Sequence, residues 1–548
     1  MPGGIMNLIS VGSQNIMLNG NPKKTFFKST YSKYTNFGMQ QFRLDFDGQK
    51  TLNYSSESVF KFKVPRYADL LSDAYVVVNL PDIWSSIYVP PGTDVSLNEV
   101  RPYEFKWINE LGTNMIKEIK ILIGGQEINR YSGEYIAMIK ERDFNDAKKE
   151  LFNKMTGNVN SLNDPGTSEG NTNAYPTAYW YNMGDEADTN IPHKNEEPSI
   201  RGRKLYIPLE SWFGQSSKMA FPLISLQYME LHIEVTFRPI YQLYKIRDVT
   251  NDISDNRIDY IAPSLGNEYH SLYRFTQPPN IPTDQIGNSI VGNVYPLRRN
   301  DWNADIHLQA TYIFLDEPER NLFARQQQKY LLRLPYERDF FSVAGSQIVE
   351  LKSRDMISNY MWRFRRSDAF MRNVWSNYTN LKYENKGNII PVFFNNKFCY
   401  FSSGNESIEN VRDILVDLAI VVDGKYRENL LDAGTFNYIE KYLRTSGNAK
   451  NGLYVYNFNI NSNLRDLQPS GAFNTNKFNN VNFEFNTISP PIDLSGVTVN
   501  VICDNGVPIG VDKDVTQIYE YNFDLKVVEE RYNVLVFTSG MANLEYAR

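Results

Sequence analysis

Short segments in which apolar and polar residues alternate recur along the chain from residue 59 to the C-terminus. In residues 229–237 the apolar set is Met229, Leu231, Ile233, Val235 and Phe237, and the residues between them are Glu230, His232, Glu234 and Thr236. The same period of two returns at 306–314, 454–460 and 481–485. It predicts strands with one face on a core and the other towards solvent. Many such strands separated by loops favour β-sandwiches over a parallel α/β sheet.

Helical patterns are few and short. One helix is predicted after Asp316, where Asp316 and Glu319 can act as a capping pair and Pro318 fits the first turn. Its expected apolar stripe consists of Leu322, Phe323 and Tyr330. A second candidate covers roughly 132–149. The chain is therefore expected to be all-β, with two sandwiches, few helices and long loops.

Two polar stretches suggest how the chain is divided. Residues from about 153 to 200 are rich in Asn and Gly and too long for a hairpin, which predicts a surface loop. Residues 241–304 separate two blocks of strands. A chain of 548 residues also exceeds one ordinary core. We expect an N-terminal arm at 1–28, a first sandwich at 29–240, a linker or insertion at 241–304 and a second sandwich at 305–548.

The composition limits the possible partners and compartments. The chain has 57 Lys and Arg against 63 Asp and Glu, a net charge of −6, which argues against direct wrapping of nucleic acid. Two cysteines far apart in sequence, Cys399 and Cys503, form no disulfide framework. No stretch has the 18 or more apolar residues of a membrane span, and no secretion segment is visible. Pro2 excludes the myristoylation pattern. We expect a protein made inside a cell.

Candidate chemistry is sparse. The four histidines lie singly, without the spacing that places two ligands on one metal ion. Gly124-Gly125-Gln126 lacks the ending of a phosphate-binding loop and predicts a tight β-turn. The acidic pairs Glu196-Glu197 and Glu529-Glu530 are expected to be solvated. The basic run at 363–366 (RFRR) could bind nucleic acid, but salt bridges to a neighbouring subunit are favoured in an acidic chain. We therefore predict no catalytic, cofactor or metal site and no small-molecule substrate.

Three Asn-x-Ser/Thr tripeptides are candidate glycosylation sites. They begin at Asn53, Asn377 and Asn405. Such tripeptides arise often by chance in a chain rich in Asn, and without a secretion signal they are expected to stay bare.

Long segments of the chain resemble one family, the double jelly-roll major capsid proteins of large icosahedral DNA viruses. The matching segments are Gly3–Asn21, Thr25–Phe37, Pro102–Gly112, Ile123–Ile128, Gly202–Ile240, Trp302–Ala324, Arg365–Asn380 and Tyr532–Ala547. They follow one another in the family's order over nearly the whole chain. The resemblance implies two consecutive eight-stranded antiparallel jelly rolls.

The same resemblance implies a function and partners. Three subunits would form a pseudo-hexagonal capsomer, and these homotrimers would contact neighbouring capsomers to tile the outer shell of a virion assembled in the host cytoplasm. The N-terminal arm would lie on the inner face, near minor capsid proteins or an internal membrane. Glycans are found on some relatives, at other kinds of sites.

Two other functions compete with that of a shell protein. Lectins share the jelly-roll architecture, and the aromatic segment AYPTAYWY at 174–181 could stack on sugars, which keeps a carbohydrate-binding protein as the alternative. An enzyme on a β scaffold is disfavoured because no nucleophile, base and metal occur in a known pattern. The segment resemblance favours the shell protein.

Overall fold

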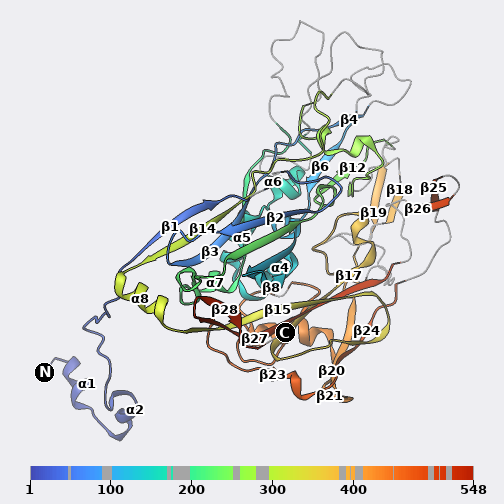
Figure 1. Cartoon of the computed structure of the whole chain (residues 1–548). Coiled ribbons are helices and arrows are strands. Elements are labelled where there is room, and N and C mark those ends of the chain that lie inside the picture. Colours follow the sequence, from blue (N-terminus) through green and yellow to red (C-terminus); the bar gives the residue numbers. More distant parts are fainter. Residues whose placement is uncertain are drawn as a thin grey trace.

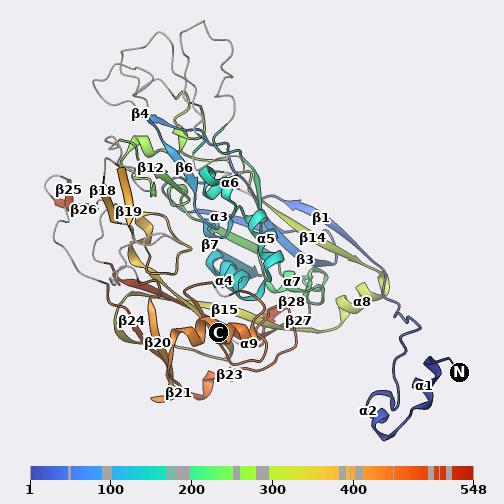
Figure 2. The same ribbon diagram turned by 180° about the vertical axis from the view of Figure 1, so that it is seen from behind.

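Two β-sandwiches lie against each other in the computed structural model, and an N-terminal arm projects from one end (Figures 1 and 2). The structure describes residues 2–46, 48, 51–88, 101–168, 175–176, 198–250, 260–278, 295–381, 390–394, 397–401, 411–448, 450–490, 499–504, 507–513 and 521–546.

The first sandwich consists of two facing antiparallel sheets. One has the order β1-β14-β3, with β9 and β10 both pairing with the free edge of β3, and the other has the order β2-β11-β7-β8. The strands are β1 (Phe37–Leu44), β2 (Ser58–Val64), β3 (Leu70–Asn79), β7 (Ile116–Ile123), β8 (Gln126–Tyr131), β9 (Lys204–Pro208), β10 (Phe221–Pro222), β11 (Leu231–Phe237) and β14 (His307–Leu315).

The second sandwich has the same construction. Its sheets have the orders β15-β27-β17-β22 and β16-β24-β20-β21, with β23 also pairing with β17, and β28 with β27. The strands are β15 (Gln328–Val343), β16 (Ser346–Glu350), β17 (Met356–Arg366), β20 (Leu415–Val422), β21 (Lys425–Asp432), β22 (Leu453–Asn457), β23 (Phe473–Asn474), β24 (Val481–Thr487), β27 (Phe523–Thr538) and β28 (Met541–Leu544).

The two sandwiches repeat strand for strand. In chain order β1, β2, β3, β7, β8, β9/β10, β11 and β14 occupy the places that β15, β16, β17, β20, β21, β22/β23, β24 and β27 occupy in the second unit. Counting each split edge strand once, both are eight-stranded antiparallel jelly rolls. The predicted fold class is confirmed, although the sequence itself shows no internal repeat.

The topology corrects two predicted boundaries. The prediction started the second unit at residue 305, but β14 pairs along its length with β1 and β3 and is the last strand of the first jelly roll. The predicted linker at 241–304 lies between β11 and β14, so it is an insertion within the first jelly roll. Its strand β12 (Tyr244–Arg247) pairs with β6 (Glu104–Trp107) of the same unit. The second unit begins instead with β15, after helix α8.

The remaining described elements are short. The helices are α1 (Gly4–Ile9), α2 (Ile16–Asn19), α3 (Leu111–Met115), α4 (Gly133–Asp143), α5 (Asp146–Thr156), α6 (Asn160–Asn163), α7 (Trp212–Gln215), α8 (Glu317–Arg325) and α9 (Glu440–Arg444), with the π-helical η10 (Thr435–Ile439) just before α9. The small strands are β4 (Ile87–Tyr88), β5 (Arg101–Pro102), β13 (Tyr260–Ile261), β18 (Ile390–Phe394), β19 (Lys397–Phe401), β25 (Val499–Asp504) and β26 (Val507–Lys513).

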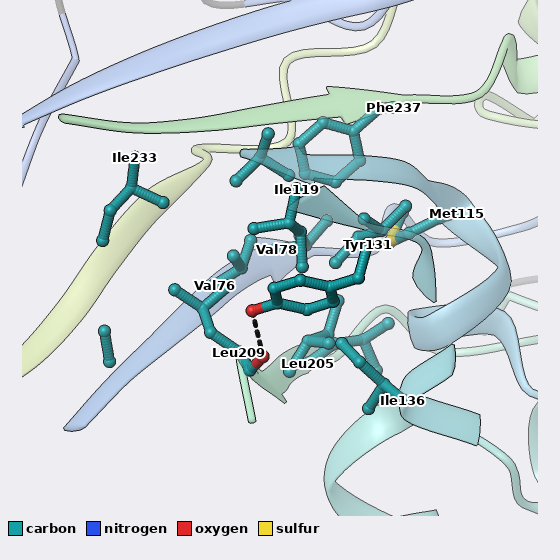
Figure 3. Packing of buried hydrophobic residues seen from close by; sticks show 14 of the residues in the cluster. Val76, Val78, Met115, Ile119, Tyr131, Ile136, Leu205, Leu209, Ile233 and Phe237 are labelled. Carbon is teal, nitrogen blue, oxygen red and sulfur yellow. Dashed lines mark hydrogen bonds between the residues drawn. The ribbon is translucent and has the colours of Figure 1, made fainter. Parts of the chain in front are cut away.

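The predicted alternation of apolar and polar residues is confirmed where the strands face a core. In β11 and β24 every second residue is buried, beginning with Leu231 and Val481. Figure 3 shows the first core, where Tyr131 donates a hydrogen bond from its hydroxyl to the carbonyl oxygen of Leu209 at 2.5 Å. The pattern failed at Ile460, which is 78% exposed because β22 already ends at Asn457.

The helix and turn predictions are largely confirmed. Asp316 caps α8 by accepting from the backbone N–H of Glu317, although no residue of α8 is buried and Tyr330 of the expected stripe lies in β15. The second candidate helix is two helices, α4 and α5, with a break at Phe144 and Asn145. The predicted surface loop at 153–200 starts in α5 and continues into α6, and most of it lies outside the described residues.

Candidate functional site: the seam between the two jelly rolls

Helix α4 of the first jelly roll forms the centre of the seam. It follows β8 and lies on the outer face of the β15-β27-β17 sheet, as Figure 2 shows. Ser132 caps the helix by accepting from the backbone N–H of Tyr135 at 3.3 Å. Gly133 starts it where a Cβ atom would lie 1.9 Å from the carbonyl oxygen of Thr113. Ten of its eleven residues are buried, charged ones included.

Glu134 of α4 is surrounded by cations from the second jelly roll. Its carboxylate makes a bidentate pair with Arg363 of β17, with Nε–Oε1 at 2.6 Å and Nη2–Oε2 at 3.1 Å. Arg365 and Lys526 lie 3.5 and 3.7 Å away. Burial opposes ionisation, but these cations outweigh it and hold the pKa of Glu134 well below its usual range. Burial and the neighbouring Arg363 lower the pKa of Arg365 to about 10.

Glu530 of β27 forms a second cluster with the C-terminal end of α4. Its Oε1 lies 2.9 Å from Nη1 of Arg142, and its Oε2 lies 3.3 Å from Nε of Arg333. It also accepts from the Tyr135 hydroxyl at 2.9 Å and from Nδ2 of Asn359 at 2.8 Å. Burial opposes the charge, yet the two arginines lower the pKa of Glu530. A buried charge with this many partners is compensated rather than stranded.

A third cluster is centred on Glu110, just before α3. Oε1 of Glu110 lies 3.0 Å from Nζ of Lys140 in α4 and 3.1 Å from Nζ of Lys450 in the second jelly roll. Burial would raise the pKa of Glu110, but the two lysines lower it to about 2. Each of the three clusters therefore joins a residue of one jelly roll to residues of the other.

The apolar core also continues across the seam. Leu334, Met361 and Val528 of the second jelly roll pack in one cluster with the core of the first. Their strand neighbours Trp362 and Val527 belong to the separate core of the second jelly roll. Alternate residues of the same strands therefore pack in the seam and in the inner core of the second jelly roll. The two jelly rolls are joined by continuous apolar packing.

Two charged motifs of the sequence have their partners inside the chain. The run at 363–366 was expected to bridge to a neighbouring subunit, but Arg363 and Arg365 pair with Glu134, and Arg366 pairs with Asp368 at 2.7 Å. Glu529 and Glu530 were expected to be solvated, and both are fully buried. They point to opposite faces of β27, where Glu529 pairs with Arg531. Both predictions were wrong. Arg363, Arg365 and Glu530 face the seam with the first jelly roll, whereas Glu529 lies on the opposite face, where it accepts from the Ser353 hydroxyl at 2.6 Å.

The structure also places several histidines and glycines that the sequence singled out. Within the described part of the chain, no group of three or more His, Cys, Asp or Glu residues could hold a metal ion. Nδ1 of His270 accepts a hydrogen bond from the backbone N–H of Ser264 at 3.0 Å, and His193 lies outside the described residues. Gly124 and Gly125 have φ angles of 58° and 84° and form the predicted tight turn between β7 and β8. No described helix is long and apolar enough to cross a membrane.

The three candidate glycosylation sites differ in position. Asn377 is 5% exposed, and its Nδ2 donates to the carbonyl oxygen of Leu381 at 2.7 Å, so the folded chain hides the atom that a glycan would occupy. Asn53 is half-buried beside Ser58. Asn405 lies outside the described residues.

Several known capsid proteins are similar to this chain in sequence. The family profile described as "Major capsid protein N-terminus" matches residues 25–272. "Major capsid protein" of Pyramimonas orientalis virus is 23% identical over 548 residues and spans 100% of both chains. "Probable capsid protein 4" of Acanthamoeba polyphaga mimivirus is 22% identical over 535 residues, covering 88% of this chain and 92% of the relative. The chain is thus similar along its whole length to the major capsid proteins of large DNA viruses.

Solved capsid structures have the same fold. "PBCV-1 virus capsid, quasi-atomic model" superposes with a TM-score of 0.60 at 18% identity, covering 96% of this chain and 100% of that chain. "Faustovirus major capsid protein" gives 0.59 at 12% identity, covering 94% and 93%. These likenesses support a major capsid protein of a large DNA virus. Within such a protein, the seam is the site that joins the two jelly rolls.

Proposed function

We propose that the capsid protein assembles into homotrimers that serve as pseudo-hexagonal capsomers and tile the icosahedral shell. The observation that carries this proposal is the strand-for-strand repetition of one jelly roll within a single block. Three such blocks around an axis give six similar units, and closed cyclic symmetry is the usual state of homo-oligomers. The buried ion clusters of the seam support it, because a flat tile must resist bending between its two halves.

The N-terminal arm supports a contact on the inner side of the shell. Residues 2–34 are exposed apart from half-buried Asn15, and the hydrogen bonds given for them stay within the arm. The exposed apolar side chains include Leu18, Phe26 and Phe27, and the arm carries four lysines and no acidic residue. Apolar and basic chains together suit a minor capsid protein or the surface of an internal membrane.

The outer end of the tile is proposed to carry the long loop of 153–200 and any glycans. The loop leaves the first jelly roll between β8 and β9, at one end of the sandwich. With a net charge of −6, the shell is not proposed to contact the genome directly. Assembly is proposed to take place in the cytoplasm of the host, and catalysis is not proposed.

Native mass spectrometry of the purified protein, followed by electron microscopy of concentrated samples, tests this function. We expect a species of three chains and hexagonal arrays. A monodisperse, soluble species of one chain, 63.5 kDa, would contradict the proposal. Retention of such a monomer on a glycan column would favour the carbohydrate-binding alternative.

A further inference from the structure

The second jelly roll has a helix where the first has α4. In the first unit α4 lies between β8 and β9, and in the second η10 and α9 lie between the corresponding strands β21 and β22. Helix α4 of the first jelly roll packs on a sheet of the second jelly roll in the same chain. In a ring of such units, the equivalent helix of the second jelly roll would therefore face a sheet of the first jelly roll in the next copy. Nothing in the described part of this chain covers its outer face.

In the η10–α9 helix, Thr435–Arg444, several polar residues face inwards and large apolar residues face solvent. Its inner face carries Phe436, Asn437, Glu440 and Lys441, all buried. Phe436 packs edge-on against Trp362 with ring centroids 5.2 Å apart, and Oε2 of Glu440 accepts from Nδ2 of Asn457 at 3.0 Å. These contacts fix the orientation of the helix, so its outer face cannot turn inwards.

The outer face is a cluster of large apolar side chains. Tyr438, Ile439, Tyr442 and Leu443 are 53%, 53%, 88% and 62% exposed. A large aromatic side chain buries roughly 150–250 Å², and one partner of a standard interface contributes about 800 Å². The face therefore offers a substantial part of one interface. It has no cation of its own for lipid or nucleic acid phosphates, so a protein surface fits it best.

The first jelly roll presents the matching sheet. Within the chain, α4 covers the outer face of β15-β27-β17, and the equivalent face of the first unit belongs to β1-β14-β3. On that face Gln41 pairs with Thr311 of β14, and Thr311 pairs with Asp73 of β3. All three side chains reach solvent at least in part.

The same face contains a hollow with an unpaired acceptor. A cavity of about 230 Å³ opens beside β3, lined among others by Asp73, Tyr75, Leu151, Met155, Glu210 and Arg465. Oδ1 of Asp73 is buried there without a hydrogen-bond partner. Glu210 holds a left-handed φ of 47°, a strained backbone of the kind found at binding clamps. Charged residues also line the hollow, and two of them, Arg465 and Glu210, pair with each other at 3.4 Å. The apolar part of the lining, with Phe144, Leu151, Phe152 and Met155, and the unpaired Asp73 oxygen together match a phenol ring with its hydroxyl.

We propose that the outer face of the η10–α9 helix docks on the β1-β14-β3 sheet of the next copy, with a tyrosine of the helix entering the hollow at Asp73. The contact repeats between copies what α4 does within one chain. It is heterologous, so it closes into a ring when the rotation fits. The inference rests on the proposed trimer and names the surfaces that form it.

Charge introduction tests the surface. Tyr442→Glu places a carboxylate on the helix face opposite Asp73, and we expect native mass spectrometry to show loss of the trimer at concentrations where the unmodified protein is trimeric. Tyr442→Phe keeps the ring and should remain trimeric. Leu322→Glu places the same charge on a half-exposed apolar residue of α8, and this control should remain trimeric. Thermal unfolding of every variant checks that the chain is folded, and the side chain at 442 is too exposed for its exchange to unfold the chain.

Photo-crosslinking locates the partner surface. A photoreactive phenylalanine analogue at position 442 should yield cross-links between copies to peptides containing 37–44, 70–79 or 307–315. A trimeric Tyr442→Glu variant, equal dissociation by Leu322→Glu, or cross-links confined to other segments of a trimeric sample would overturn the inference and leave the trimer intact. An unmodified protein that is monomeric would instead refute the proposed function itself.

Discussion

Arg363 of β17 holds Glu134 of α4 in a bidentate ion pair that joins the two jelly rolls, with N–O distances of 2.6 and 3.1 Å. Both side chains are at least 95% buried. A buried pair of this kind gains little over an apolar contact of equal size, but removal of one partner strands the other in a medium of low dielectric constant. The pair is therefore a sensitive reporter of how strongly the seam holds the block together.

Replacement of one partner should destabilise the protein. We expect Glu134→Gln to lower the free energy of unfolding by ~3–5 kcal/mol, because Arg363 and Arg365 would remain buried without their carboxylate. Arg363→Met should cost less, since Arg365 and Lys526 still lie 3.5 and 3.7 Å from Glu134. The double variant should be more stable than the sum of the two losses predicts. Denaturant unfolding of all four proteins measures the coupling.

An exposed pair serves as the control for that cycle. Lys63 and Glu230 lie 2.7 Å apart on the surface of the first jelly roll, with side chains 60% and 51% exposed. The variants Lys63→Met and Glu230→Gln should change stability by only ~0–1 kcal/mol. If variants of both pairs lost the same free energy of unfolding, burial in the seam would not be what makes the Glu134–Arg363 pair important.

Acid should lower the stability of the protein by protonating buried carboxylates, including Glu110 at the seam. Glu110 has a pKa of about 2 in the folded protein against 4.5 when unfolded, and Asp368, held by Arg366 and Arg372, has a pKa of about 2 against 3.8. Both folded values are depressed, so the stabilisation is complete above pH 4.5 and is lost as the pH falls towards 2. For Glu110 this amounts to roughly 3 kcal/mol. Glu110→Gln should flatten the fall in stability between pH 4.5 and 2 in denaturant titrations, and Glu350→Gln at an exposed position of β16 should not.

The sequence predicted the strands far better than the contacts between them. Alternation identified β11 and β24 because one face of each strand meets a core and the other meets solvent. The same rule fails for β17, where Met361 and Trp362 are both buried because one faces the seam and the other the inner core. Glu530 looked solvated for the same reason. A local pattern of apolar residues indicates whether one face of a strand is covered. It does not indicate which distant segment covers that face.

The domain boundary could not be read from composition. The polar residues of 241–304 resemble a linker, yet the chain returns to add β14 to the first sheet. Only strand pairing between positions more than 200 residues apart reveals this. In contrast, the turn at Gly124 and the cap at Asp316 were predictable, because both depend on neighbours within a few residues.

Lys441 should make stability rise with pH above neutrality. Burial lowers its pKa from 10.5 to about 7, outweighing the opposing effect of Glu141, and Lys149 lowers it further. Its Nζ donates to Oδ1 of Asn437 at 2.9 Å and to the carbonyl oxygen of Lys450 at 3.2 Å. The unfolded chain binds the proton more tightly than the folded chain between pH 7 and 10.5, so the free energy of unfolding should increase across that window.

A methionine at position 441 tests this assignment. Lys441→Met removes the buried titrating group, and we expect a gain of ~1–4 kcal/mol at pH 7 together with a flatter profile between pH 7 and 9.5. Above that range the comparison ends, because burial raises the pKa of tyrosines such as Tyr330, to about 12, and their ionisation on unfolding then lowers stability. An unchanged slope in Lys441→Met would show that another group titrates.

A single added methyl group at Gly133 should loosen the seam. Helix propensity alone predicts that Gly133→Ala stabilises the protein, since alanine is favoured over glycine in a helix by about 1 kcal/mol. The structure predicts the opposite sign, because the new Cβ would lie 1.9 Å from the carbonyl oxygen of Thr113 and 2.7 Å from that of Ile116, both rigid backbone atoms. We expect a loss of ~1–3 kcal/mol as α4 shifts. Gly38→Ala in the exposed strand β1 meets nothing within 4 Å and should be neutral or stabilising. Thermal unfolding of the two variants compares the signs directly, and a stabilised Gly133→Ala would mean that α4 does not approach α3 as closely as described.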